Sequence, residues 1–559
     1  MPHPTARRSH PLIEPVESRQ LLAAGALDPT FGAGGKLQLG QVAPGLHLTG
    51  GGDVIALPGG KSVLLAGDDD GSASHLVRLN ADGSLDTTFG VGGVATADGN
   101  PLSPSSSGPI AGPQALDETP VGMIRLPDGK YLVAGRAYGP AGADNFYLAQ
   151  FNADGAPDTA FGVSGIKKFT FDNGNGHVNR SAYLAAQSDG KIVLVGTAKR
   201  AGADAFAQDI AVLRLNADGT PDASFGNNGQ VIRTGGAGGN FATDLVIQPD
   251  GKILVAGGNM VAVQTGMGDG YTGGAGFVWR LNADGSTDTS FGNGGTVSLG
   301  TPAGTHGVVE RIALAPDGTI VGVSNAWNGN DVPPATVVYK LNAADGSPVG
   351  NGGTGTIVAT GRGINRILVA PDAKIYLAGL TRDGAPAQDG PLDFDVIRLN
   401  ADLSLDTSFA NAGDFRTSFG PTGADDQATA LALTADGKLI VAGVAPDASA
   451  TVHGGDLAVL RLDLGAPAAN PQSRRSPKRI AMEQAAQQST TGSKRSPKRI
   501  ALEEAAKSAT GSKRSPKRVA METAAIEQAI ADARAAGSTR SAKQIAHDAL
   551  AMFSTTRIS

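Results

Sequence analysis

The residues best suited to chemistry by type and spacing are acidic groups in a recurring segment, Asn-x-Asp-Gly-x-x-Asp, at positions 80–86, 216–222 and 282–288. An EF-hand loop places calcium ligands at similar intervals. In the first copy, however, the first ligand position would be Arg78 and the twelfth Phe89, and neither offers a carboxylate. A hairpin turn closed by Asn and Asp side chains accounts for the same residues. We therefore interpret the segment as a turn and predict no metal site.

Other signatures of catalysis or cofactor binding are incomplete or absent. Gly60-Lys61-Ser62 ends like a phosphate-binding loop, but Ile55 stands where the first glycine belongs. The sequence has no Gly-x-Ser-x-Gly and no His-Glu-x-x-His segment, and its eight histidines are dispersed. It has no cysteine, which excludes thiol catalysis, iron–sulfur clusters and disulfides. We predict no cofactor, and we expect a protein that is not an enzyme.

The acidic segments belong to an internal repeat of roughly 60 residues. Each unit combines Asp-Gly-Lys, Arg-Leu-Asn-x-Asp-Gly and Leu-Asp-x-Thr-Phe-Gly segments, and variants of the first two occur seven times. In the fourth unit, four runs of β-branched and aromatic residues alternate with turns such as Pro249-Asp250-Gly251. Four antiparallel strands repeated seven times predict an all-β fold, a seven-bladed propeller of four-stranded blades.

The two ends of the repeat region complement each other. The seventh unit lacks its Leu-Asp-x-Thr-Phe-Gly segment and fourth strand, whereas the chain begins with an orphan LDPTFG at 27–32 and a strand-like run at 35–40. We predict that the run at 35–40 pairs with the strand near 456–463 and closes the ring, which removes open sheet edges. The predicted domains are a leader (1–26), the propeller (27–465) and a tail (466–559).

The repeated aromatic and cationic residues have structural roles in this interpretation. We expect the phenylalanines of the third segment to pack between neighbouring blades: Phe31, Phe89, Phe161, Phe225, Phe291 and Phe409. We expect the arginines of the second segment to pair with the following Asp across the hairpin: Arg78, Arg214, Arg280 and Arg398. The fifth unit departs from the pattern after Asn342, so its last turn should be irregular.

The three repeated segments resemble those of the bacterial delta-60 repeat family over residues 27–465. That resemblance implies a propeller-like fold and no known reaction. Residues 12–22, LIEPVESRQLL, resemble the LEP-x-x-LE-x-R-x-LL motif that opens many exported planctomycete-type proteins, with Ile13 and Val16 in place of leucine. This second resemblance implies export or display at the cell surface. The alternative is an untargeted cytoplasmic leader, because no apolar core follows Arg7 and Arg8.

Loop lengths vary on one face of the predicted propeller. The connections between second and third strands differ widely in length, and the connections between blades are also irregular, whereas the hairpin turns barely change. Variable loops on a rigid scaffold are where binding usually resides. The candidate ligand-binding residues on this face are Asp68, Asp69, Tyr138, His177, Tyr271, His306, Trp327, Arg362 and His453. Drift in loops that bind nothing would give the same pattern.

The charge of the chain is divided between an acidic body and a basic tail. Residues 466–559 hold 17 Lys and Arg against 7 Asp and Glu, whereas the whole 559-residue chain has a net charge of −6. Ser-Pro-Lys-Arg recurs at 476–479, 496–499 and 515–518, each copy starting a short Ala-rich run that we expect to be partly helical. The tetrapeptide resembles the Ser-Pro-Lys-Lys motifs of histone tails, which implies DNA binding. The candidate polyanion-binding residues are Lys478, Arg479, Lys498, Arg499, Lys517 and Arg518.

Three functions follow from the sequence. The first is a binding or surface scaffold, extracellular or at the cell surface, with a protein or carbohydrate partner on the variable face and DNA or an anionic envelope polymer on the tail. The second is an intracellular nucleic-acid-associated protein that uses the tail. The third is a hydrolase or lyase on the variable face. We expect a monomer, and no run of residues is apolar enough to span a membrane.

Residues 474–518 should bind duplex DNA or another dense polyanion through charge alone, because the basic clusters come with few aromatic residues to stack on bases. Replacing the six candidate Lys and Arg residues with Gln should abolish binding and leave the propeller folded. The measurement is a salt titration of affinity for several DNA sequences, which should fall steeply with salt and hardly differ between sequences. Equally tight binding by residues 27–465 alone would refute the prediction.

Overall fold

The computed structural model describes residues 24–42, 48–68, 73–98, 118–137, 145–169, 180–199, 208–235, 239–265, 268–300, 307–326, 335–350, 355–382, 392–420, 425–446 and 455–465. All of them lie in the first of the two units into which the chain divides, Met1–Pro467 and Ala468–Ser559. The N-terminal motif at 12–22 and the predicted tail with its helices lie outside these residues. No helix in the described part of the chain is long and apolar enough to cross a membrane.

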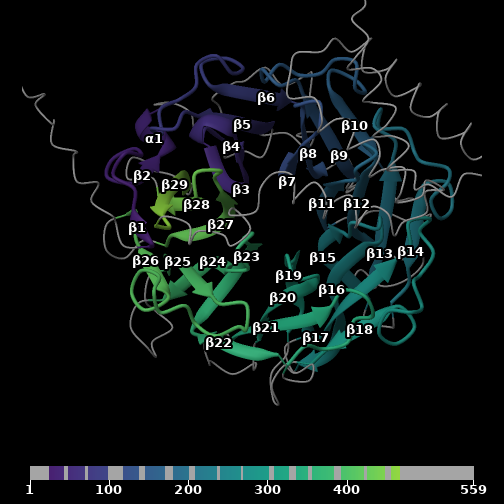
Figure 1. Cartoon of the computed structure of the whole chain (residues 1–559). Helices are drawn as coiled ribbons and strands as arrows, with labels where there is room; N and C mark the ends of the chain where they lie inside the picture. Colours follow the sequence, from purple (N-terminus) through teal and green to yellow (C-terminus); the bar gives the residue numbers. More distant parts are fainter. Residues whose placement is uncertain are drawn as a thin grey trace, which may run out of the picture. The chain divides into compact units, whose positions relative to one another are not determined.

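The described residues form seven antiparallel sheets, each a meander of four consecutive strands except at the ring closure (Figure 1). We number them blades 1 to 7 in chain order. Consecutive first strands contact one another around the ring, from β3 and β7 through to β27 and back to β3. The first strands therefore surround the axis. The predicted seven-bladed propeller is confirmed.

Each blade runs from a first strand at the axis to an outermost strand at the rim. The first strands of blades 1 to 7 are β3 (Leu48–Ala56), β7 (Glu118–Arg125), β11 (Arg180–Ala186), β15 (Asn240–Ile247), β19 (Val309–Leu314), β23 (Arg362–Val369) and β27 (Gln427–Leu433). The second strands are β4 (Ser62–Asp68), β8 (Tyr131–Ala137), β12 (Ile192–Lys199), β16 (Ile253–Thr265), β20 (Thr319–Ala326), β24 (Ile375–Arg382) and β28 (Lys438–Pro446). The third strands are β5 (Ala73–Leu79), β9 (Asn145–Phe151), β13 (Gln208–Leu215), β17 (Gly268–Leu281), β21 (Ala335–Asn342), β25 (Leu392–Leu399) and β29 (Gly455–Asp463). The outermost strands of blades 1 to 6 are β6 (Val94–Asp98), β10 (Ile166–Phe169), β14 (Gln230–Arg233), β18 (Thr296–Leu299), β22 (Thr356–Thr360) and β26 (Asp414–Thr417).

The hairpin turns follow from their sequences. In blade 4, the Asp-Gly turn between β15 and β16 places Gly251 at φ +85°, a conformation that side chains with a Cβ rarely adopt. Blade 1 has Gly59 and Gly60 instead of Asp-Gly, and its turn includes the short helix η1 (Pro58–Gly60). Blade 5, which lacks the third sequence segment, has a register shift between β21 and β22. This shift lies within the strand pair, at Thr336 and Val337, so it does not test the turn predicted to be irregular after Asn342.

The apolar core lies between the blades. Adjacent sheets enclose seven separate clusters of buried side chains, such as the one between blades 5 and 6 that includes Val321, Val338 and Ile397. Strand residues alternate between the two faces of a sheet. Each blade therefore contributes one set of side chains to the cluster before it and another to the cluster after it, and a blade detached from the ring would expose both.

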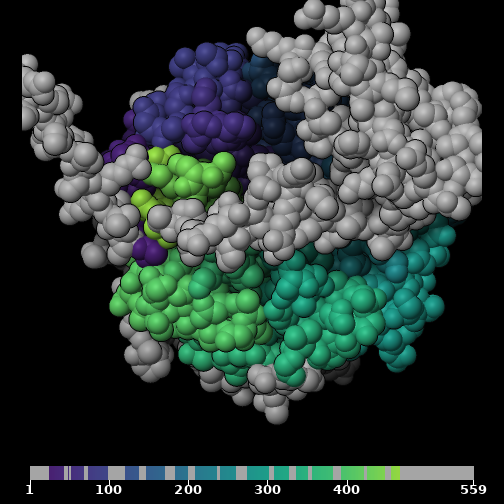
Figure 2. All heavy atoms as spheres, in the orientation of Figure 1, coloured from purple at the N-terminus to yellow at the C-terminus, as the bar shows by residue number. Residues whose placement is uncertain are grey.

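The ring closes with the N-terminal segment. Strands β1 (Ala26–Leu27) and β2 (Lys36–Gln38) both pair antiparallel with β29 and supply the outer edge of blade 7, and the short helix α1 (Leu39–Val42) follows β2. Lys36, Leu37 and Gln38 lie opposite Leu460, Val459 and Ala458. In Figure 2, purple atoms of this segment lie beside the yellow-green atoms of blade 7. The predicted closure is confirmed.

A buried ion pair fixes the closure. The Asp28 carboxylate accepts hydrogen bonds from Arg461 Nε, at 2.7 Å, and from Lys438 Nζ, and its side chain is 2% exposed. Asp28 also accepts bonds from the backbone nitrogen and the hydroxyl of Thr30. The two ends of the propeller are thus joined by charge as well as by strand pairing.

Replacing Asp28 with Asn should weaken this closure, because Arg461 would keep its charge in a buried place without a carboxylate. We expect the free energy of unfolding to fall by roughly 3 kcal/mol and aggregation to increase as the edge of blade 7 opens. Urea unfolding at pH 7 and light scattering measure the two effects. The matched control is Asp82→Asn in an exposed turn, and equal stability of the two variants would contradict the prediction.

Candidate functional site

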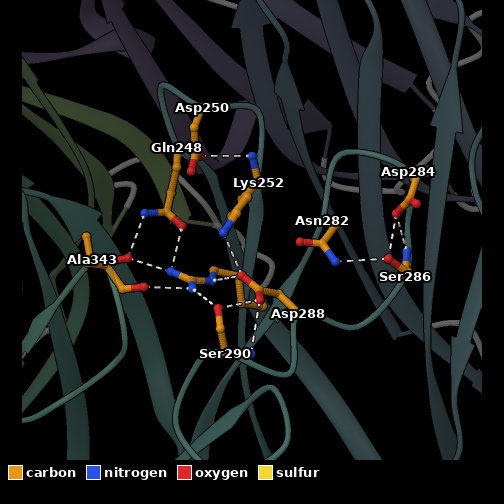
Figure 3. Close-up of polar contacts among 11 residues, drawn as sticks. Gln248, Asp250, Lys252, Asn282, Asp284, Ser286, Asp288, Ser290 and Ala343 are labelled. Carbon is orange, nitrogen blue, oxygen red and sulfur yellow. Dashed lines mark hydrogen bonds and ion pairs between the residues drawn. The ribbon is translucent and has the colours of Figure 1, made fainter. Parts of the chain in front are cut away.

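Each blade has a polar cluster built from the repeated sequence segments, and Figure 3 shows the one in blade 4. Asp288 Oδ2 lies 2.8 Å from Lys252 Nζ and 2.8 Å from Arg280 Nε. Asp288 Oδ1 accepts a bond from the Ser290 hydroxyl at 2.6 Å. Lys252 follows the first turn of the blade, Arg280 lies in β17, and Asp288 lies between β17 and β18. One carboxylate therefore ties together three parts of one blade.

The same cluster recurs around the ring. Its members are Lys61, Arg78 and Asp86; Lys191, Arg214 and Asp222; Lys374, Arg398 and Asp406; and Lys438, Arg461 and Asp28. In blade 2 the cluster keeps only Lys130 and Asp158, and in blade 5 Lys340 pairs with Asp317 instead. The predicted pairing of each arginine with the following Asp is confirmed. The lysine, which also binds that Asp, was not expected.

The phenylalanines complete the cluster. All six predicted rings are buried, with at most 3% of the residue exposed. In blade 3 the Arg214 guanidinium lies 4.5 Å from the centre of the Phe225 ring. A Cβ added at Gly285 in the next blade would lie 3.0 Å from Phe225 Cδ2. The expected packing of these rings between blades is confirmed, and it needs glycine in the neighbouring turn.

The segments with calcium-like spacing are turns. Asp284 Oδ1 accepts bonds from the backbone nitrogen of Ser286 at 2.9 Å and from its hydroxyl at 2.6 Å (Figure 3). Asn282 donates to the same hydroxyl, and Asp288 is held by the cluster described above. The carboxylate oxygens that a cation would use are thus bonded to groups of the same blade, as the turn interpretation predicts.

A different position in the repeat places charged and polar side chains near the axis of the propeller. The residue eight places before the lysine of the cluster, or before Thr319 in blade 5, directly follows a bulge in every first strand. A bulge bends a strand and redirects the side chains beside it. In order from blade 1 to blade 7, these residues are Asp53, Gly122, Tyr183, Asp244, Arg311, Arg366 and Ala430. We call them the axial ring.

The two carboxylates of the axial ring bind the backbone of the following blade. Asp53 Oδ2 accepts a bond from the Met123 nitrogen in blade 2 at 3.2 Å. Asp244 Oδ2 accepts one from the Ile312 nitrogen in blade 5 at 2.9 Å. Both groups therefore stand between two first strands, at the same height.

The two guanidinium groups of the axial ring, Arg366 and Arg311, contact blades other than the next one along the chain. Arg366 of blade 6 donates to the Gly52 carbonyl of blade 1 at 2.7 Å and lies 3.1 Å from the Asp53 carboxylate. Arg311 of blade 5 donates to the carbonyls of Thr243 in blade 4 and Asn365 in blade 6, and it lies 4.9 Å from the Tyr183 ring of blade 3. Contacts between blades that are not neighbours place both cations at the axis, where the first strands meet.

Two acids beside Arg311 have raised pKa values. Burial raises the pKa of Asp244, although Arg311 and Arg366 oppose the shift. Burial also raises the pKa of Glu310, the bulge residue next to Arg311. Within the described residues the Glu310 carboxylate accepts no hydrogen bond, whereas Asp244 accepts two from backbone nitrogens. The channel thus holds two acids that keep protons more readily than usual, next to two fixed cations. Such groups favour acid–base chemistry.

A pocket of about 460 Å³ lies elsewhere, at the junction of blades 7 and 1, on the side of the hairpin turns. Lys438 and Arg461 line it, together with Thr30, Asp82 and Asp436. Both cations already bind Asp28. The pocket results from ring closure next to the glycine turn of blade 1, and the axial ring remains the stronger candidate.

The ligand-binding residues predicted from loop lengths have mixed positions. Arg362, at the start of β23, pairs with Asp395 and Asp414 of its own blade. Asp68 and Tyr271 lie in β4 and β17, and the structure describes only their backbone. The other six lie outside the described residues: Asp69, Tyr138, His177, His306, Trp327 and His453. So do the polyanion-binding residues predicted in the tail.

Loop length gave no sign of the axial ring, which lies in the first strands and not in the loops. Aligning the seven units on the lysine would have shown a position that is Asp, Gly, Tyr, Asp, Arg, Arg or Ala, followed in each unit by two apolar residues. This non-repeating position, charged in four of the seven units, is the sequence sign of the axial ring.

Five segments of the chain match the family model described as a domain of unknown function (DUF5122) β-propeller. They are residues 61–89, 126–161, 187–225, 266–291 and 370–409. This match agrees with the resemblance to delta-60 repeats. No curated protein was found to match the sequence.

Solved structures with similar folds include the following three. A protein of unknown function from Dyadobacter fermentans is 13% identical, with a TM-score of 0.38, and the match covers 61% of this chain and 93% of that one. An ulvan lyase of polysaccharide lyase family PL25 is 12% identical, with a TM-score of 0.39 and coverage of 75% and 95%. An α-L-arabinanase from Penicillium chrysogenum is 13% identical, with a TM-score of 0.35 and coverage of 61% and 92%.

These comparisons correct one expectation from the sequence, that the chain is not an enzyme. The propellers with similar folds include a lyase, an arabinanase and an arabinofuranosidase. The expectation rested on the absence of short catalytic motifs, and such motifs cannot detect acids that come from separate blades and meet at an axis.

The repeated clusters predict loss of stability in acid. Burial would raise the pKa values of Asp28, Asp86, Asp222, Asp288 and Asp406, but bonds from the lysines and hydroxyls and the nearby arginines hold them well below the usual range. Because these groups bind protons less readily when folded, their contribution is complete above about pH 4 and is lost as pH falls further. Urea unfolding from pH 5 to pH 2 should show this decrease, and Asp406→Asn should make it shallower. A decrease equally steep in the variant would contradict the assignment.

Proposed function

We propose that the propeller is an enzyme of the hydrolase or lyase type, with its active site in the central channel at the axial ring. The observation that carries the proposal is the pair of channel acids with raised pKa values, Glu310 and Asp244, beside Arg311 and Arg366. Groups from blades 4, 5 and 6 contribute to this one place.

The chemistry assigns a role to each group. Glu310, with a raised pKa and no bond from the described residues, acts as general acid or base on the substrate. Asp244, fixed by two backbone nitrogens, positions Arg311 and sets the local charge. Arg311 and Arg366 stabilise negative charge that develops in the transition state or is present on the substrate. Bond cleavage by water or by elimination needs a general acid or base, a group that positions the cations, and cations that stabilise negative charge.

The fold itself does not demand these charges. Blade 2 has Gly122 and blade 7 has Ala430 at the equivalent position, and both first strands keep their bulge and their pairing. A charged side chain near the axis loses hydration, which is unfavourable unless it gains partners. The charges on four of the seven blades are therefore better explained by a ligand than by the propeller's own needs.

The test is a comparison of the natural chain with Glu310→Gln on a panel of esters, peptides, and neutral and acidic polysaccharides. Release of new end groups reports hydrolysis, and ultraviolet absorbance of an unsaturated product reports elimination. Glu310→Gln should lower the rate by roughly 10²–10⁴-fold, the usual contribution of a general acid or base. Asp345→Asn, in an exposed turn of the same blade, is the matched control.

Two outcomes separate the alternatives. Equal rates for the natural chain and Glu310→Gln would remove Glu310 from catalysis. Saturable binding of a panel member without turnover, lost in Arg366→Gln, would instead make the axial ring a binding site, which is the second function that the two guanidinium groups favour.

We also propose the surface location and the polyanion-binding tail, which the resemblance of residues 12–22 and the charge of residues 466–559 support. Cell fractionation tests the location. A nucleoid fraction would favour the intracellular alternative.

A further inference from the structure

Blade 6 carries a second group of acids, away from the axial ring. Asp395 lies in β25, Asp414 and Arg416 lie in β26, and Arg362 lies at the start of β23. Arg416 stands opposite Asp395, and Asp414 stands opposite Ile397, so the three side chains share one face of the sheet. Ile397 belongs to the apolar cluster between blades 5 and 6. The charged group therefore lies on the face of blade 6 that packs against blade 5.

Equivalent positions in the other blades are mostly uncharged. The position of Asp395 is held by His75, Tyr147, Ala211, Phe277, Val337 and Ala458. The position of Asp414 is held by Val94, Ile166, Gln230, Thr296 and, at the closure, Lys36. The pair of acids is thus a feature of blade 6, whereas the repeat supplies neither acid.

One guanidinium serves both carboxyl groups. Arg362 Nη2 lies 2.6 Å from Asp414 Oδ2, which also accepts a bond from Arg416 Nε at 3.0 Å. Arg362 Nη1 approaches the Asp395 oxygens only to 3.2 and 3.3 Å. The Asp395 side chain has no exposed surface, so it gains no compensation from water. Arg416 binds only Asp414, so Asp395 has only its share of Arg362 and would be poorly compensated if both carboxyl groups were ionised.

Two oxygens of the pair are left over. Asp395 Oδ2 and Asp414 Oδ1 are buried, and neither accepts a hydrogen bond from the described residues, although Asp395 Oδ2 lies 3.2 Å from Arg362 Nη1. Each belongs to a carboxyl group whose other oxygen binds Arg362. A single proton held between the two carboxyl groups would satisfy both oxygens and remove one of the two negative charges.

We propose that Asp395 and Asp414 share one proton and form a pH-sensitive lock on the face between blades 5 and 6. While the proton is present, the pair carries one negative charge, which Arg362 compensates, and the packing of blade 5 against blade 6 is stable. Loss of the proton leaves two carboxylates side by side in an apolar joint and weakens it. Because Asp395 is fully buried, a substrate cannot reach it, and the pair acts on the stability of the joint rather than on a ligand.

The electrostatics agree with this assignment. Burial raises the pKa of Asp395 to about 7, Arg362 opposes the shift and Asp414 adds to it. Burial would also raise the pKa of Asp414, but its bond to Arg362 holds that pKa below the usual value. The pair therefore titrates near neutral pH, with the proton mainly on Asp395.

The neighbouring strands supply few other charges. On blade 5, β20 and β22 contain no titratable residue. The titratable or charged residues of β19 and β21 are Glu310, Arg311, Tyr339 and Lys340. Lys340 is paired with Asp317, and the Tyr339 hydroxyl donates to the Gly300 carbonyl. Blade 6 itself adds Tyr376, Arg382, Asp393 and Arg398 on β24 and β25.

The sign of the effect follows from proton binding. A carboxyl group whose pKa is higher in the folded chain binds an extra proton there between about pH 4 and pH 7. Its stabilising contribution is complete below about pH 4, decreases as pH rises across this window, and is lost by about pH 7. Asparagine at 395 has the neutral form at every pH, so the variant lacks this loss.

The experiment compares urea unfolding of the full chain and of Asp395→Asn at pH 5 and at pH 8. The unfolding constant of the natural chain, divided by that of the variant, should rise on the order of a hundredfold between the two pH values. Asp402→Asn, in an exposed turn of blade 6, is the matched control and should keep the pH dependence of the natural chain. A ratio that does not change with pH would overturn the proposal.

Infrared spectroscopy gives a measurement that does not depend on how stable the variant is. The natural chain at pH 6 should show the carbonyl band of a protonated carboxylic acid, which should disappear by pH 8. The difference between the natural chain and Asp395→Asn separates this band from any signal of Asp244 and Glu310. If Asp395→Asn does not fold, Asp414→Asn takes its place in the unfolding comparison. Absence of the Asp395 band at pH 6 would refute the shared proton.

Discussion

The propeller depends on one requirement: the buried arginine and the lysine of a blade need a carboxylate between them. In blades 1, 3, 4 and 6 the chain meets this requirement within one blade. Blade 7 has Lys438 and Arg461 but no such Asp nearby in sequence, and Asp28 supplies it from more than 400 residues away. Closure is therefore more than strand pairing, because the last blade is electrostatically incomplete until the first residues of the propeller return to it.

Because the clusters hold the turn side of the ring, the axis is free to vary. The bulge in each first strand is retained whether the next residue is Gly122, Ala430 or Arg366. The hydrogen bonds across the axis are not repeated in every blade. Arg311 joins blade 5 to blades 4 and 6, and Arg366 joins blade 6 to blade 1. A repeated scaffold thus carries a site that does not repeat, and this separation lets one architecture serve different chemistries.

The fold could be predicted from the sequence because its determinants are local and repeated. The Asp-Gly turns, the strand alternation and the orphan segment at 27–32 each recur or complement one another along the chain. The Arg78–Asp86 pairing was predictable for the same reason, since both residues lie in one hairpin. The axial ring was not predicted. Arg366 meets Asp53 across the axis, and nothing in either segment alone indicates that the two are close.

The same side chain behaves in opposite ways in two parts of the molecule, and the number of donors explains the difference. Asp288 is as buried as many core residues, yet its pKa is lowered because a lysine, an arginine and a serine all bind it. Asp395 is more deeply buried and shares its one arginine with Asp414, so its pKa is raised. In each repeated cluster, several donors bind one carboxylate, so that Asp stays ionised and holds the blade together. In blade 6 the carboxyl group of Asp395 lacks donors of its own, and a proton supplies the missing partner, so this pair responds to pH near neutrality whereas the repeated clusters respond only in acid.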